Sequence, residues 1–467
     1  MFWNYIIISF RKFKRQKFYS LLNIFGLATG MATVLLITLY VLEELSFDRF
    51  HKNSGDLYRV VENQYYGDRE VFPVAVTPYA LAASLKENYP EVELAARANF
   101  IWGNFKYAET EIDQRGIVVD PDFLKMFSFE FQRGNDSTSL KEINSLIVTE
   151  EFAKKLFGKE EAFGKTIRFS GDKELVVTAV LRNPPTNSHF SFSYIMPTEF
   201  RLAQDPKLRN DWEVNALYTY VKLVSGASVS KIDDQIKKQI ERNSESKGVE
   251  LYLQPVTDIH LGDVNFIAEV SGKGNKQYVV IFTIVAVFIL IIACINFMNL
   301  STARAMKRAK EIGLRKTVGA HRYQLIFQFL GESVMVAFVA MAISLLMVDL
   351  LLPPFNTLIQ KNLQLDFKSV DGIIPVSIAA TLITGLLAGS YPAIFLSSFQ
   401  AAKVLKGTIH TSSAGGTFRK VMVVLQFCVS IIMISGTLIV YSQIQFIRNK
   451  NLGFEKEKII NGFKIKL

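Results

Sequence analysis

Five apolar runs of membrane-spanning length constrain this chain more than any other feature. About 20 apolar residues in one helix cross the hydrocarbon core of a bilayer, because a helix rises about 1.5 Å per residue. No run of that length occurs between residues 46 and 276. We therefore predict a multi-span α-helical membrane protein with a soluble domain inserted between its first and second transmembrane helices. The apolar runs lie near residues 21–42, 279–300, 325–352, 373–396 and 421–441.

The soluble stretch alternates between strand-like and helix-like patterns. Helical periodicity predicts helices at 77–88, 149–157 and 229–244, two of which begin at a Thr or Ser cap. This mixture predicts an α+β domain. Runs rich in β-branched and aromatic residues predict strands at 57–65, 71–76, 117–119, 146–149, 175–181 and 217–224.

Composition excludes several classes of function. The formal charge of +10 could indicate nucleic acid binding, but the basic residues gather beside the apolar runs and no nucleic-acid motif accompanies them. Both cysteines, Cys294 and Cys428, fall inside predicted spans, so the soluble domain has no disulfide framework. The spacing of His, Cys, Asp and Glu matches no metal site. We expect no metal, no cofactor and no catalytic residues.

The basic residues also predict topology. Five cations in FRKFKRQKF precede the first span, which places the N-terminus in the cytoplasm and the soluble domain outside it. The first apolar run is longer than a signal-peptide core and lacks a small-x-small cleavage site, so we expect an uncleaved span. Residues 1–18 mix aromatic residues with cations, which is typical of an interfacial helix on membrane lipids.

The connector between the second and third runs is short and basic, and Glu311 is its only acid. Helix-forming residues at 303–318 and a stop at Gly319 predict a short amphipathic helix at the cytoplasmic surface. One interpretation is an anchor that only fixes topology and contacts lipid headgroups; the other is a docking element. The cations of the connector are Arg304, Lys307, Arg308, Lys310, Arg315, Lys316 and Arg322.

Three separated blocks of the chain resemble one family. The string NFMNLSTARAMKRAKEIGLRKTVGAHRYQLIFQFLGES resembles the signature of the MacB/FtsX family of ABC-transporter permeases. EELSFDRFHKNSGDLYRVVE resembles the start of the family's extracytoplasmic domain, and AGSYPAIFLSSFQAAKVLKG resembles the segment that follows its last core helix. In that block Gly385, Gly389 and Ser390 permit close helix contact, and Pro392 would kink or end the helix.

The resemblance implies a domain organisation. It divides the chain into an interfacial helix and first span (1–45), a MacB-like periplasmic core domain (46–276), an FtsX-like permease core with the second to fourth spans (277–400), and a cytoplasmic linker, fifth span and start of a truncated second half (401–467). The tail string NKNLGFEKEKII resembles the start of a second ectodomain in double-length permeases. The chain is then the N-terminal half of such a permease, and the alternative is a natural five-span protein.

The resemblance also implies a function. The chain would be a non-catalytic permease subunit in the bacterial inner membrane that pairs with a separate ABC ATPase and with a second permease half or a second copy of itself. A periplasmic adaptor is a further expected partner. ATP-driven movement of the ectodomain would export a drug, peptide or lipoprotein; the alternative is a regulator or sensor that activates a periplasmic cell-wall hydrolase or a signalling partner. The residues expected to dock the ATPase are Arg304, Lys307, Glu311, Gly313, Arg315, Lys316 and Gly319.

Two stretches of the soluble domain invite other interpretations. GKEEAFGKT at 158–166 is similar to a phosphate-binding loop, but five residues separate its glycines instead of four and it follows a helical pattern. We expect a turn that leads into a strand. His189 follows Asn187-Ser188, and without a partnered acid or nucleophile nearby in the sequence we expect it to be an ordinary loop residue.

Overall fold

The computed structural model describes residues 17–67, 70–171, 173–270, 272–365, 373–398 and 413–449. It divides into two compact units. The inserted domain is Tyr40–Val280, and the membrane unit combines Met1–Leu39 with Ile281–Leu467. The predicted interfacial helix before residue 17, the linker at 399–412 and the tail from residue 450 lie outside the described residues.

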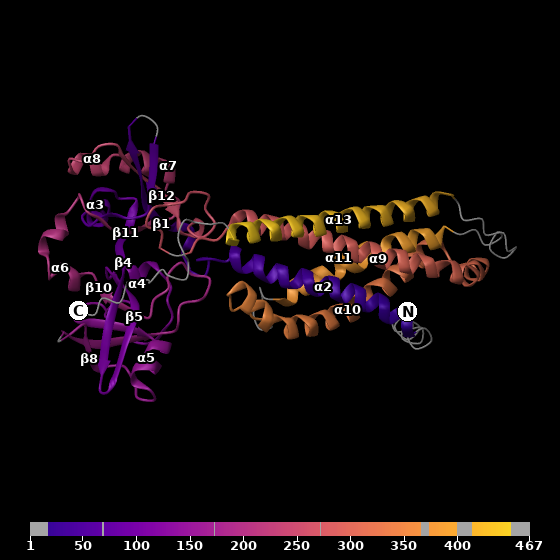
Figure 1. Ribbon diagram of the computed structural model, residues 1–467, viewed down its shortest axis with the longest axis horizontal. Helices are drawn as coiled ribbons and strands as arrows, with labels where there is room; N and C mark the ends of the chain where they lie inside the picture. The colour runs from indigo at the N-terminus through magenta and orange to yellow at the C-terminus, as the bar shows by residue number, and fades with distance from the viewer. Residues whose placement is uncertain are drawn as a thin grey trace. The chain divides into compact units, whose positions relative to one another are not determined.

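One mixed β-sheet organises the inserted domain (Figure 1). Its strand order is β12–β1–β11–β4–β5–β10–β7–β9–β6, with β2 beside β1, β3 beside β11, and β8 beside β4 and β9. The pairs β5–β10 and β7–β9 are parallel, and the other pairs in the described part are antiparallel. The strands are β1 Leu57–Tyr66, β2 Glu70–Val74, β3 Thr77–Pro78, β4 Val92–Tyr107, β5 Thr110–Val119, β6 Phe131–Arg133, β7 Ser145–Thr149, β8 Thr166–Phe169, β9 Lys173–Leu181, β10 Tyr194–Pro197, β11 Asn215–Leu223 and β12 Val249–Pro255.

Both faces of this sheet are covered, because successive side chains of a strand point to opposite faces. In β1, Leu57 and Val61 join one buried cluster while Val60 joins another. Short helices supply much of the covering, so the predicted α+β class is confirmed. The helices are α3 Leu81–Asn88, α4 Phe123–Met126, α5 Glu150–Phe157, α6 Glu199–Leu202, α7 Val229–Ile236 and α8 Gln239–Asn243.

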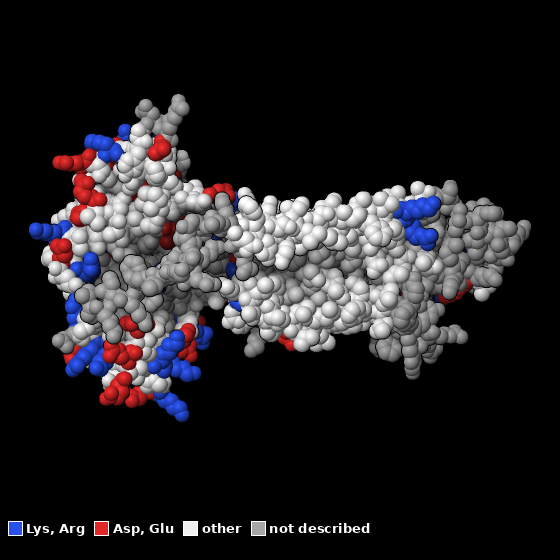
Figure 2. Space-filling model, in the orientation of Figure 1, with Lys and Arg blue, Asp and Glu red and all other residues white. Residues whose placement is uncertain are grey.

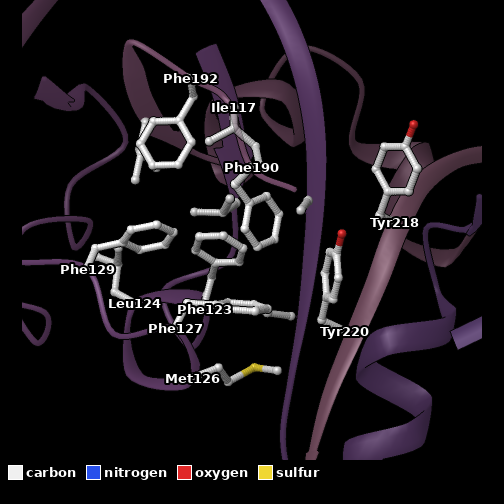
Figure 3. Packing of buried hydrophobic residues seen from close by; sticks show 14 of the residues in the cluster. Ile117, Phe123, Leu124, Met126, Phe127, Phe129, Phe190, Phe192, Tyr218 and Tyr220 are labelled. Atoms are coloured by element: carbon white, nitrogen blue, oxygen red, sulfur yellow. The ribbon is translucent and has the colours of Figure 1, made fainter. Parts of the chain in front are cut away.

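An aromatic cluster fills the core beside α4 (Figure 3). The ring of Phe190 meets those of Phe123 and Phe127 edge-on, with centroids 5.0 and 4.8 Å apart. Phe127 in turn meets Tyr220 of β11 edge-on at 5.3 Å. Edge-to-face contacts of this kind stabilise a core beyond the area that they bury. They connect the loop before β10 to the central strands.

The predicted helix at 149–157 is confirmed as α5, and Thr149 is its cap. The Phe152 N–H donates to Thr149 Oγ1 at 3.4 Å. Ser228 stands at the same position before α7 but makes no side-chain cap bond, and the helix expected at 77–88 begins only at Leu81, since Thr77 belongs to β3.

We expect Thr149→Ala to lower the free energy of unfolding of the inserted domain by about 1 kcal/mol, because the first turn of α5 loses an acceptor. Urea unfolding of the full chain, followed by tryptophan fluorescence, measures this. Ser228→Ala is the matched control and should change stability by less than about 0.5 kcal/mol. Equal effects of the two substitutions would contradict the capping role.

The membrane unit consists of long helices, so the multi-span prediction is confirmed. Five helices in the described residues are long and apolar enough to cross a membrane. Figure 2 shows that charged side chains are nearly absent from the visible face of these helices and frequent on the inserted domain. The helices are α2 Lys17–Leu45, α9 Lys276–Thr317, α10 Arg322–Ile359, α11 Ile373–Ser397 and α13 Ser413–Asn449.

Small residues set the helix contacts in this unit. A Cβ on Gly385 of α11 would lie 2.8 Å from Val334 Cα of α10, and one on Gly389 would lie 2.7 Å from Ser333 Cβ. The expected close contact at these glycines is therefore confirmed. Pro392 was expected to kink or end its helix; it does not end it, because α11 continues to Ser397. Tertiary packing lets membrane helices retain proline in this way.

Candidate coupling surface at the α9–α10 turn

The basic connector differs from the separate helix that was expected at 303–318. Residues 276–317 form the single helix α9, so the connector prolongs the second span and the chain turns only at 318–321. No glycine or proline interrupts residues 277–312, and Ala303, Ala305 and Ala309 favour helix. Propagating an existing helix needs no new nucleus, whereas a separate short helix would need one.

A Schellman motif closes α9. The Ala320 N–H donates to Arg315 O at 3.0 Å, and the Gly319 N–H donates to Lys316 O at 3.1 Å. Gly319 has φ +97°, a conformation that L side chains rarely adopt. Its predicted role as the helix stop is confirmed. His321 then caps α10 through a reciprocal pair of bonds with Gln324.

A polar network fastens the end of α9 to α10. Arg315 donates to Glu311 Oε1 and to Gln328 Oε1, both at 2.8 Å. Gln328 Nε2 donates in turn to Glu332 Oε1 at 3.1 Å. Arg315 and Glu311 stay partly exposed, at 36% and 42% of the side chain. The pair can therefore hold the helices together and still face a partner.

Lys316 fastens α9 to α11 instead of facing outward. Its Nζ donates to Ser397 O at 2.6 Å, at the C-terminal end of α11, and Arg322 Nε donates to Ser397 Oγ at 3.4 Å. A cation is favourable there because the carbonyl end of a helix carries partial negative charge. Burial and the neighbouring Arg322 charge lower the pKa of Lys316. This residue is part of the scaffold beneath the turn.

An apolar cluster completes that scaffold. Ile312 of α9 packs with Leu325 and Phe329 of α10 and with Ala393 and Leu396 of α11, and all five are buried. The ends of the three helices are thus joined by apolar packing and by hydrogen bonds.

The sequence interpretation missed a set of exposed apolar side chains, which we call the tip surface. Leu314 and Val318 at the end of α9 are 59% and 81% exposed, and Tyr323 and Phe327 at the start of α10 are 58% and 72% exposed. Each pair has i,i+4 spacing, which places its members on one face of the helix. That spacing on both sides of Gly319 was the available signal. Leu314 and Val318 lie beyond the candidate membrane spans, whereas Tyr323 and Phe327 lie in the first turns of the span that begins at Arg322. Exposed apolar side chains outside a span are typical of a protein-binding surface.

The seven residues predicted to dock an ATPase therefore divide into groups. Arg304 and Lys307 lie on α9, but their side chains are outside the described residues. Glu311 and Arg315 form the partly exposed pair, and Lys316 binds α11. Gly313 is buried inside α9, so its expected role at a helix end is wrong, while Gly319 does end the helix.

The predictions for residues 158–166 and for His189 have different outcomes in the structure. Residues 158–166 run from the end of α5 through a turn into β8, which confirms the turn interpretation. His189 lies in a loop, but the expectation that it lacks a partnered acid is wrong. Its Nδ1 lies 2.8 Å from Asp48 Oδ1, and both side chains are fully buried. These two residues are 141 positions apart, so no local pattern could indicate the contact.

Two family models match this chain. The MacB-like periplasmic core domain matches residues 20–239, and the FtsX-like permease C-terminal domain matches residues 283–401. The chain belongs to the MacB/FtsX family of permeases. The FtsX-like match contains the end of α9, the turn and the start of α10, so the candidate surface lies within the part shared with that family.

Named relatives agree with this assignment. A macrolide export ATP-binding/permease protein MacB from Neisseria gonorrhoeae is 22% identical over 339 residues, which are 69% of this chain and 49% of the relative. A MacB from Bdellovibrio bacteriovorus is 30% identical over 140 residues, 30% of this chain and 21% of the relative. The chain spans less than half the length of these curated relatives.

Two solved structures are similar to less than half of this chain. The periplasmic region of MacB from Actinobacillus actinomycetemcomitans is 12% identical with a TM-score of 0.34, covering 44% of this chain and 91% of that one. The extracellular domain of the noncanonic ABC-type transporter YknZ from Gram-positive bacteria is 16% identical with a TM-score of 0.33, covering 42% of this chain and 99% of that one.

Proposed function

We propose that this chain is the permease subunit of an ABC transporter and that it couples ATP hydrolysis on a separate subunit to movement of the inserted domain. The observation that carries the proposal is the tip surface, which exposes Leu314, Val318, Tyr323 and Phe327 on a turn fixed to α10 and α11. An ATPase subunit that packs on this surface can move the ends of α9, α10 and α11 together. No catalytic group is needed for that role.

The charge pattern supports a cytoplasmic position for the turn. Seven cations and a single acid lie between Arg304 and Arg322, and such an excess of Lys and Arg is typical of cytoplasmic loops. With five spans, the inserted domain then lies outside the cytoplasm and the N-terminus lies inside. We place the protein in the bacterial inner membrane, in contact with anionic lipids and with a second permease half or a second copy.

The proposed cargo is a drug, peptide or lipoprotein taken from the extracytoplasmic side. Support comes from the relatives, whose names describe macrolide export, and from the size of the inserted domain, Tyr40–Val280. Deletion of the gene should raise sensitivity to toxic compounds. A defect in cell separation with unchanged sensitivity would support the regulatory alternative instead, in which the same movement activates a cell-wall hydrolase.

Val318→Glu tests the tip surface. We expect it to lower stimulation of the partner ATPase at least tenfold, because a carboxylate must then be desolvated where an apolar contact was made. The measurement is purification of the tagged full chain with its ATPase, identified by mass spectrometry, and an ATPase assay after reconstitution in nanodiscs. Glu311→Lys, which breaks the bond to Arg315, should act in the same direction.

The control is Val214→Glu, which places the same charge on an exposed valine of the inserted domain, 46% exposed. We expect wild-type membrane insertion from all three variants and wild-type stimulation from the control. Full stimulation of the ATPase by Val318→Glu and Glu311→Lys would refute docking at this turn. Gly313 is a poorer test than Val318, because a bulky residue at that buried position would disturb the packing of α9.

A further inference from the structure

The segment that leaves α2 buries an unusual number of ionisable groups. Glu44, Asp48 and His51 are 3%, 0% and 2% exposed. The chain has five histidines, and three of them, His51, His189 and His260, are buried and contact residues 44–51 or their neighbours. Ionisable side chains are seldom fully buried unless they are paired. Each buried ionisable group of this segment is therefore expected to have a partner.

Asp48 holds the loop that contains His189. Its backbone has φ +59°, and its N–H donates to Asn187 O at 2.8 Å. Its Oδ1 accepts the His189 N–H at 3.0 Å and lies 2.8 Å from His189 Nδ1. His189 Nε2 lies 3.0 Å from the Tyr220 hydroxyl on β11. These contacts join the segment to the central sheet.

The charges in this chain of bonds are settled by burial and by the partners. Burial raises the pKa of Asp48, but the interaction and hydrogen bonds with His189 outweigh it, and the pKa lies below its usual range. Burial raises the pKa of Tyr220 well above 10, so the hydroxyl keeps its proton. A carboxylate that accepts from imidazole and backbone N–H groups makes stronger bonds than a neutral acceptor.

A second set of contacts involves the segment that leads from the inserted domain into α9. Glu44 Oε2 bonds to His260 Nε2 at 2.9 Å, and the ring of Phe47 stacks on that of His260 with centroids 3.4 Å apart. The Gly274 N–H donates to His260 O at 2.9 Å, and Gly274 lies two residues before α9 begins at Lys276. His260 thus contacts both the segment that leaves α2 and the segment that enters α9.

Gly274 allows these contacts by having no side chain. A Cβ there would lie 2.4 Å from His260 Nε2 and 2.7 Å from Glu44 Oε2, closer than any real contact. Gly272, two residues earlier, has nothing within 4 Å of the same position. The close approach is therefore specific to the residue that faces the Glu44–His260 bond.

We propose that these residues form an elbow clamp, which consists of Glu44, Phe47, Asp48, His189, His260 and Gly274. The clamp makes the two segments that lead into and out of the inserted domain, residues 43–51 and 258–275, open and close together. All six residues belong to the Tyr40–Val280 unit. The clamp fixes the last turn of α2 to the β11 strand and to the chain that leads into α9. A displacement of either helix end is then transmitted to the central sheet through these contacts and is not absorbed by a flexible linker.

Hydrogen exchange of the full chain in nanodiscs tests the clamp, with Gly274→Ala compared to Gly272→Ala. Exchange reports the local opening of each segment. We expect Gly274→Ala to raise the exchange rate at least tenfold both in peptides that cover residues 43–51 and in peptides that cover 258–275. Gly272→Ala should match the wild type, and β7 and β9 should stay protected in both variants.

Faster exchange confined to 258–275, or equal behaviour of the two glycine variants, would overturn the proposal. Asp48→Asn provides a second test, because asparagine tolerates the left-handed backbone while removing the charge. It should release 43–51 together with 258–275, and combining it with Gly274→Ala should add little. If Gly274→Ala also exposes β7 and β9, the domain has unfolded and Asp48→Asn decides by the same comparison. The readout needs no ATPase, so it stands apart from the proposed function.

Discussion

Gly385→Leu is expected to disrupt the packing of α10 against α11. A Cβ at this position would lie 2.8 Å from Val334 Cα, a backbone atom, so the two helices must separate to admit any side chain. Overpacking of this kind typically costs about 3 kcal/mol at the upper end of its range. For a unit of this size that corresponds to a fall in the melting temperature of about 10 °C. Thermal unfolding of the membrane unit in detergent, followed by size-exclusion chromatography, measures the change.

Gly331→Leu is the matched control, because Gly331 also lies in a membrane helix and a Cβ there has nothing within 4 Å. It should leave the melting temperature within about 2 °C, since replacing an exposed helical glycine is neutral or slightly favourable. Similar losses from both substitutions would mean that a leucine anywhere in these helices is harmful. The close α10–α11 contact would then not be the cause.

Glu62 is expected to make the inserted domain less stable as the pH rises. Its side chain is fully buried in β1, where Oε2 accepts from Gln64 Nε2 at 2.9 Å and from Asn215 Nδ2 at 2.7 Å. Oε1 has no hydrogen-bond partner among the described residues. Burial raises the pKa of this carboxyl to about 7, although the bonds from Gln64 and Asn215 lower it in part. The folded domain therefore favours the neutral acid.

The sign follows from proton binding. Between the ordinary pKa of 4.5 and the folded value of about 7, the unfolded chain has lost a proton that the folded domain keeps. Stability from this group is thus fully present below pH 4.5 and is lost as the pH rises through 7, by about 3 kcal/mol in total. Below pH 4.5 the contribution of Glu62 to the free energy of unfolding is constant, and stability changes there only as other groups titrate.

Glu62→Gln, which resembles the protonated acid, should remove this dependence. We expect the variant to be more stable than the wild type by about 3 kcal/mol at pH 8 and to match it near pH 4.5. Urea unfolding of the full chain at a series of pH values measures the difference. Burial lowers the pKa of His51 to about 4, but that contribution is common to both proteins and cancels. A difference that does not change with pH would contradict the assignment.

Some of the architecture was readable from short stretches of sequence. The β-branched runs at 146–149 and 175–181 became β7 and β9, because residues of this type fit a pleated strand covered on both faces. By contrast, β4 was missed, although it is the longest strand among the described residues. Its N-terminal half is rich in alanine, and Ala95 and Ala96 are small residues buried on opposite faces of the sheet. Pairing with β5 and β11 makes it a strand, and neither partner is adjacent to that alanine-rich segment.

The candidate coupling surface shows the same division. Gly319 and the basic residues of the turn were recognisable because a helix stop and a charge excess are local properties. The scaffold role of Lys316 was not, because its acceptor, Ser397 O, belongs to another helix 81 residues away. Gly313 was assigned to a helix end on the basis of residue type alone, and the continuity of α9 places it inside.

The sequence by itself determined the five membrane-spanning helices, the position of the inserted domain and the basic turn, because each depends on the composition of one contiguous stretch against the thickness of a bilayer. Only the tertiary structure decided which polar residues bond to another helix or loop and which are exposed. Glu44 meets His260 across 216 residues, and a buried polar contact of that kind forms only when the fold brings both partners within hydrogen-bond distance.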